Sequence, residues 1–70
     1  MIPLCFTDPG EEHVIHKIGG RPEVKKHLEN LGFITGARVT VLNTISGNLI
    51  VKVMETRVAI SQELAQKIYV

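Results

Sequence analysis

Hydrophobic residues recur at helical spacing in one segment of the chain. Val24, Leu28 and Leu31 stand at positions i, i+4 and i+7, which places them on one face of an α-helix. Pro22 is suited to the first helical turn, where a missing N–H costs nothing, and Gly32 can adopt the left-handed conformation that ends a helix. The pattern therefore predicts a helix that begins near Pro22 and ends at Gly32.

Hydrophobic and polar residues alternate in the segment that follows. Val39 and Val41 alternate with polar neighbours, which predicts a half-buried strand over residues 38–44. Residues 46–48, Ser-Gly-Asn, are a strong turn signal, and residues 49–54 alternate again. These two strands are predicted to form a hairpin.

The C-terminal part predicts one more strand and a short helix. Residues 57–60 can pair beside the hairpin, and Ser61 is a good N-cap for a helix. Leu64 and Ile68 are expected on one face of that helix, and residues 69–70 are left to close the sheet.

The N-terminal part predicts an extended segment and a turn. In residues 2–6 we expect Leu4 and Phe6 on the same side of a short extended chain. Residues 8–10, Asp-Pro-Gly, favour a type II turn with proline and glycine at its centre.

A single long strand is predicted over residues 12–18. Alternation places its residues on two faces: Val14, His16 and Ile18 on one, His13, Ile15 and Lys17 on the other. Because His13 and His16 then leave from opposite faces, they are poorly placed to chelate one metal ion. With His27 expected on the polar side of its helix, no metal site and no cofactor are predicted.

Several short strands with tight turns predict a mainly β fold with two short helices. The chain is too short for two large sheets, and a closed or nearly closed small barrel would remove exposed edges. An open α+β sheet with the first helix on one face is the alternative. An exposed edge at residues 49–53 would allow self-association, so a homo-oligomer stays open.

Four short elements together resemble the FeoA family, small cytosolic proteins associated with bacterial ferrous iron uptake. They are Pro9-Gly10-Glu11, Ile18-Gly19-Gly20, Leu31-Gly32-Phe33 with Gly36, and Arg57-Val58-Ala59-Ile60. Thr35 departs from the proline usual before Gly36, and Glu55-Thr56 replaces a turn that usually contains glycine, which leaves that hairpin's shape open. The resemblance extends over nearly the whole chain and implies a single domain, residues 1–70, with the fold of a small SH3-like β-barrel with two added helices.

Composition limits the functional classes. The 70 residues are 44% hydrophobic, and eight Lys and Arg against seven Asp and Glu give a net charge of +1. There is no basic field for nucleic acid, and no apolar run approaches the roughly 20 residues that span a bilayer. A single cysteine, Cys5, forms no internal disulfide, which agrees with a cytoplasmic location. Cys5 is expected to be a packing residue.

Binding is the predicted activity, since neither a phosphate-binding loop nor a catalytic constellation is present, and the chain is not expected to be an enzyme. Leu31, Phe33 and Ile34 form an apolar cluster at the helix exit, more than a capping motif needs. They are the candidate partner-binding residues, although Leu31 and Phe33 also suit the core, and Ile34 is the expected exposed member.

The family resemblance implies the partner. It predicts an accessory protein that binds the GTP-binding cytosolic region of the membrane transporter FeoB and supports its assembly or activity. The alternative is a stand-alone SH3-like regulatory module, related to the C-terminal domain of metal-dependent repressors, that binds another protein. An RNA-binding barrel is disfavoured by the charge and by the scarcity of aromatic residues.

Overall fold

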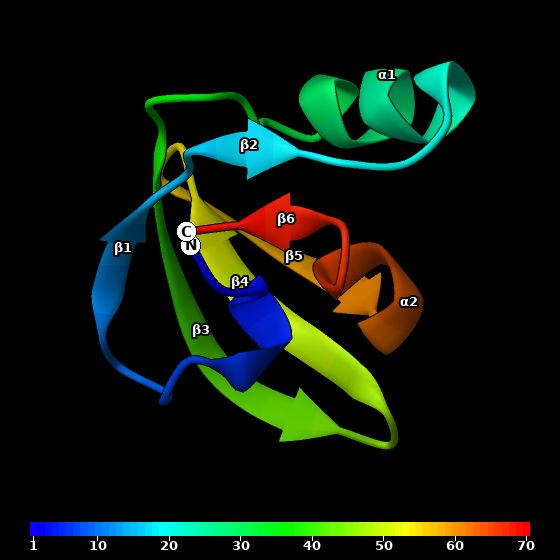
Figure 1. Cartoon of the computed structure of the whole chain (residues 1–70). Helices are drawn as coiled ribbons and strands as arrows, with labels where there is room; N and C mark the ends of the chain where they lie inside the picture. The colour runs from blue at the N-terminus through cyan, green and yellow to red at the C-terminus, as the bar shows by residue number, and fades with distance from the viewer.

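The strands of the computed structural model, which describes residues 1–70, form two antiparallel sheets (Figure 1). The larger sheet has the order β1-β3-β4-β5 and the smaller pairs β2 with β6. The strands are β1 (Glu12–Val14), β2 (Lys17–Ile18), β3 (Arg38–Ile45), β4 (Asn48–Val53), β5 (Thr56–Ser61) and β6 (Ile68–Tyr69). The helices are the 3-10 turn η1 (Leu4–Phe6), α1 (Pro22–Asn30) and α2 (Gln62–Ala65).

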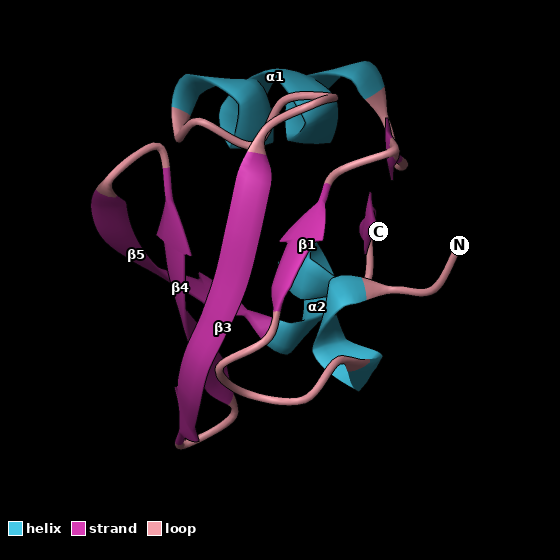
Figure 2. Ribbon diagram, turned by 90° about the vertical axis from the view of Figure 1, so that its left-hand side faces the viewer, coloured by secondary structure: helices cyan, strands magenta, loops and turns pink.

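The fold is mainly β with two short α-helices, as predicted, but the sheets do not close into a barrel. Strand β4 lies inside the larger sheet, between β3 and β5, so the expectation of an exposed edge at residues 49–53 is wrong. The edge strands are β1 and β5. Helix α1 crosses one end of the sheets rather than covering a face, unlike the alternative of an open sheet (Figure 2).

The predicted strand over residues 12–18 is broken into β1 and β2. Ile15 and Ile18 are both buried, and residues three apart in a straight strand would point to opposite faces. The backbone resolves this conflict by changing sheets: the Ile15 N–H donates to the Ala37 carbonyl, whereas the His16 N–H donates to the Tyr69 carbonyl. The prediction that Val14 and Ile18 share a face is therefore wrong, since Val14 is exposed and Ile18 is buried.

Two hairpins with two-residue turns join β3, β4 and β5. Ser46 and Gly47 have φ of 50° and 80°, and Met54 and Glu55 have φ of 52° and 64°, which gives both turns the twist that suits antiparallel strands. The first turn was predicted from its glycine. The second is equally tight, although it places two residues with side chains in the left-handed region.

The chain ends differ from the prediction in two respects. Residues 4–6 form η1 rather than an extended segment, so Leu4 is fully buried while Phe6 is 72% exposed. Helix α2 ends at Ala65, and Ile68 lies in β6 instead of on a helical face. The Ser61 cap is confirmed, since the Leu64 N–H donates to Ser61 Oγ at 3.2 Å.

The core consists of fourteen buried residues, all apolar, and Phe33 is its only aromatic side chain. Leu49, Val51 and Val53 of β4 point into it, as their alternation predicted. They are joined by residues from the other strands, both α-helices and the connecting segments: Leu4, Ile15, Ile18, Leu28, Phe33, Ala37, Val39, Val41, Ile60, Ala65 and Ile68. Helix α1 is thereby fixed to the sheets through Leu28.

Candidate functional site

The C-terminus of α1 fixes the segment that contains the candidate partner-binding residues. Gly32, with φ of 106°, donates its N–H to the Glu29 carbonyl at 3.0 Å, and Phe33 donates to the Leu28 carbonyl at 2.9 Å. These two bonds are the Schellman arrangement, which satisfies carbonyls left free at a helix end. The predicted stop at Gly32 is confirmed.

A second turn follows at once and fixes Ile34. The Ala37 N–H donates to the Ile34 carbonyl at 3.0 Å, and Gly36 at the third position has φ of 92°. This is the geometry of a type II turn, for which glycine is favoured. The backbone of Ile34 is therefore held between two hydrogen-bonded turns.

The three candidate residues occupy different environments. Phe33 is fully buried, Leu31 is half-buried against the core, and Ile34 is 42% exposed. The expectation that Ile34 is the exposed member is confirmed. Because Phe33 is fully buried, it cannot contact a partner directly and can only hold Ile34 in place. The partner-binding role of the three residues stays a prediction.

Ile34 lines a shallow depression to which α1 contributes Lys25 and Glu29 and β2 contributes Lys17 and Ile18. We call this depression, with a volume of about 410 Å³, the helix hollow. Its lining residues are His16, Lys17, Ile18, Lys25, Glu29, Ile34 and Thr35. Two of these residues, Ile18 and Ile34, are apolar, and three others, Lys17, Lys25 and Glu29, are charged, so that the hollow offers both apolar and charged contacts to a ligand.

A second depression, the sheet hollow, has a volume of about 420 Å³ and opens on the larger sheet. It is lined by Glu12, Arg38, Thr40, Lys52, Val53, Met54 and Glu55. Arg38 Nη1 lies 3.6 Å from Glu12 Oε1, so this hollow contains an ion pair. Sequence reasoning predicted neither hollow, because each is lined by segments far apart in the chain.

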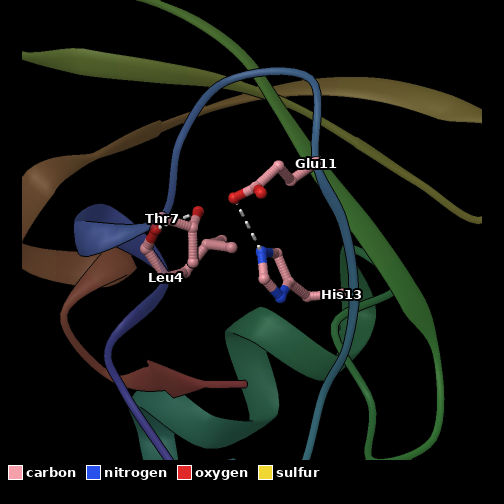
Figure 3. A network of polar contacts seen from close by, with 4 residues as sticks. All are labelled: Leu4, Thr7, Glu11 and His13. Atoms are coloured by element: carbon pink, nitrogen blue, oxygen red, sulfur yellow. Dashed lines mark hydrogen bonds and ion pairs between the residues drawn. The ribbon is translucent and has the colours of Figure 1, made fainter.

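The histidines and Cys5 do not come together as a ligand set. No three His, Cys, Asp or Glu side chains are grouped as they would be around a metal ion. His13 Nε2 points toward Glu11 Oε1 at 3.8 Å and has no hydrogen-bond partner, while the neighbouring Thr7 hydroxyl donates to the Leu4 carbonyl (Figure 3). His16 and His27 are exposed, and Cys5 packs against the core.

Neither helix, of nine and four residues, has the length and apolar content to cross a membrane.

The fold and the surface define a small SH3-like domain with a hollow beside its first helix. The sequence profile of the FeoA domain matches residues 2–70. The chain therefore belongs to the FeoA family of ferrous iron transport proteins.

Known proteins agree with this assignment. The chain is 31% identical over 70 residues to a protein of Methanocaldococcus jannaschii described as a putative Fe(2+) transport protein A, and the match covers all of this chain and 85% of that protein. A crystal structure of an iron uptake regulatory protein, FeoA, has a TM-score of 0.88 and 28% identity, with coverage of 96% of this chain and 91% of the other.

The same fold occurs inside a larger regulator. A manganese-dependent transcriptional repressor aligns with a TM-score of 0.88 at 21% identity, covering 97% of this chain but only 39% of the repressor. At that identity the likeness shows the fold alone.

Proposed function

We propose that this protein is a non-enzymatic cytoplasmic accessory of ferrous iron uptake that docks on the GTP-binding cytosolic region of the transporter FeoB. In this function it supports the assembly or activity of the transporter. The observation that supports the proposal most strongly is the match of the FeoA domain to residues 2–70, together with a relative described as an Fe(2+) transport protein.

The helix hollow is the proposed docking surface. Ile34 is the exposed apolar side chain of the predicted cluster, and its backbone is held by hydrogen bonds on both sides. A partly exposed apolar residue with a fixed backbone loses little conformational entropy when a partner covers it. The buried Ile18 lies in the same hollow and extends its apolar surface.

The test compares one substitution in each hollow. Ile34→Glu places a charge on the proposed contact, and we expect binding to the purified cytosolic region of the host's FeoB to weaken at least about tenfold, measured by biolayer interferometry. Met54→Glu is the matched control, because Met54 is 59% exposed and lies in the sheet hollow.

Circular dichroism must show that both variants are folded. Equal binding by both variants and the native chain would remove the helix hollow from the proposal, and no binding by the native chain would remove FeoB docking itself.

The alternative is a regulatory module that binds another protein in the manner of an attached repressor domain. The structural similarity to the manganese-dependent repressor favours this second candidate at the level of the fold. A pull-down from host membranes in the presence and absence of iron and GTP separates the two: recovery of FeoB supports the first function, and recovery of a transcriptional regulator without FeoB supports the second.

A further inference from the structure

The charges of the chain are unevenly distributed. Residues 16–30, which comprise β2, the following loop and α1, hold four of the eight Lys and Arg but only two of the seven Asp and Glu. Their formal charge is +2, and the remainder of the chain is −1. A protein that is nearly neutral as a whole thus has a basic end, and the helix hollow lies there.

The lysines of the helix hollow have no carboxylate partner. The ion pair of the structure is Arg38 with Glu12, and the other contact of this kind joins His13 to Glu11, which is an ion pair only when the histidine is protonated. Lys25 and Glu29 stand four residues apart on α1, yet they form no ion pair. Lys17 is 6.0 Å from the centre of the Tyr69 ring, its paired residue on β6. Both ammonium groups are therefore available to a ligand.

The hollow also has an apolar side, which sets it apart from a site for a small anion. Ile34 is 42% exposed beside the lysines, and Ile18 is buried beneath the same surface. A phosphate ion would use the lysines and leave Ile34 in water. A peptide side chain would cover Ile34 while neighbouring carboxylates approached Lys17 and Lys25, so that the apolar and the charged parts of the hollow are used together.

We infer that the helix hollow recognises an acidic peptide segment in which one apolar side chain is flanked by aspartate or glutamate. The apolar side chain covers Ile34, and the flanking carboxylates pair with Lys17 and Lys25. This inference rests on the proposed function, because it takes the acidic segment to be part of FeoB. It adds the chemistry of the segment that docks. Glu29, which also lines the hollow, orients the segment by repelling its carboxylates.

The experiment is a titration of the ¹⁵N-labelled chain, followed by amide chemical shifts. The probe is a capped five-residue peptide with one central leucine and two acidic residues on each side, and the control peptide has lysines in place of the acids. Inorganic phosphate at the same ionic strength is the third ligand. We expect saturable shifts around Lys17, Lys25 and Ile34 with the acidic peptide alone.

Charge reversal identifies the groups responsible. Lys17→Glu with Lys25→Glu is expected to weaken binding of the acidic peptide roughly tenfold, whereas Lys52→Glu with Arg57→Glu makes the same charge change elsewhere on the domain and is expected to leave it within about twofold. Both positions of the control pair are exposed. Shifts with the lysine peptide, saturation by phosphate at the same amides, or equal effects of both pairs would overturn the inference.

Binding of the same variants to the FeoB cytosolic region separates the acidic-segment inference from the proposed docking function. If FeoB binding is lost in Ile34→Glu and unchanged in the Lys17 and Lys25 pair, the docking function stands and the acidic segment is wrong. If the acidic peptide binds the helix hollow and FeoB does not bind the native chain, the ligand chemistry stands and the proposed function is wrong.

Discussion

The two hollows have nearly equal volumes, about 410 and 420 Å³, but their charges are organised differently. In the sheet hollow, two basic and two acidic side chains give no net charge, and Arg38 is already paired with Glu12. In the helix hollow, Lys17 and Lys25 face one acid, Glu29, without forming an ion pair with it. Volume alone does not separate the two surfaces, whereas their net charges do: two basic and two acidic side chains cancel in the sheet hollow, and two lysines against one glutamate leave +1 in the helix hollow.

The loop between α1 and β3 lies next to both hollows. This loop supplies Ile34 to the helix hollow and approaches the sheet hollow at Gly32, where an added Cβ would lie 3.2 Å from Met54 Cγ. Phe33, between these two residues, is fully buried. The buried side chain of Phe33 therefore anchors the loop that lies next to both hollows.

The largest effect is expected from Phe33→Ala. Removing the only aromatic side chain of the core should cost about 3–5 kcal/mol of the free energy of unfolding, comparable with the whole stability of so small a domain. Urea unfolding followed by circular dichroism measures it. The neighbouring Ile34→Ala is the control and should cost less than about 1 kcal/mol, since Ile34 is 42% exposed. Similar losses in both variants would contradict the separation of core from surface.

A smaller gain is expected at the turn of the sheet hollow. Glu55 has φ of 64°, a conformation that costs a residue with a side chain roughly 1–2 kcal/mol and glycine little. Glu55→Gly should raise the free energy of unfolding by about 1 kcal/mol and leave ligand binding in the helix hollow unchanged. Thermal unfolding measures the gain.

Ala59→Gly, inside β5, is the matched control and should lower stability. A loss in Glu55→Gly as large as in Ala59→Gly would show that the turn is not strained.

The smallest effect is expected from the ion pair of the sheet hollow. Glu12 and Arg38 are 60% and 73% exposed, so Glu12→Gln should change stability by less than about 0.5 kcal/mol, and less still in high salt. A double-mutant cycle with Arg38→Gln in urea, at low and high salt, gives the coupling. A coupling free energy above about 1 kcal/mol would mean that the ion pair stabilises the larger sheet and does more than neutralise the charge of the sheet hollow.

Local signals predicted the elements whose geometry is fixed by near neighbours. Gly32 ends α1, Ser61 caps α2, and the alternation of β4 buries Leu49, Val51 and Val53. In each case the residues that decide the structure are within a few positions of one another.

Tertiary constraints decided the elements that were missed. Alternation predicted one strand over residues 12–18, but the pairing of Ile15 with Ala37 and of His16 with Tyr69 breaks it. The same limit applies to the site: Ile34 was recognised as an exposed candidate, whereas Lys17 and Lys25 were not, because they come from separate elements that only the tertiary fold brings to one hollow. The signal that was present is an apolar residue, Ile34, in the loop that follows α1, together with a lysine of that helix, Lys25.

The hydrogen bonds between the two ends of the chain determine how the domain can be linked to other molecules. Ile2 and Val70 exchange two hydrogen bonds of 2.9 Å, so the first and last residues lie together, as Figure 1 shows. A short linker between them would allow circular permutation, with new ends at the exposed turn of Ser46 and Gly47. Such a permutant could be attached to a sensor surface through the turn of Ser46 and Gly47 instead of through the native ends, and the helix hollow would stay intact.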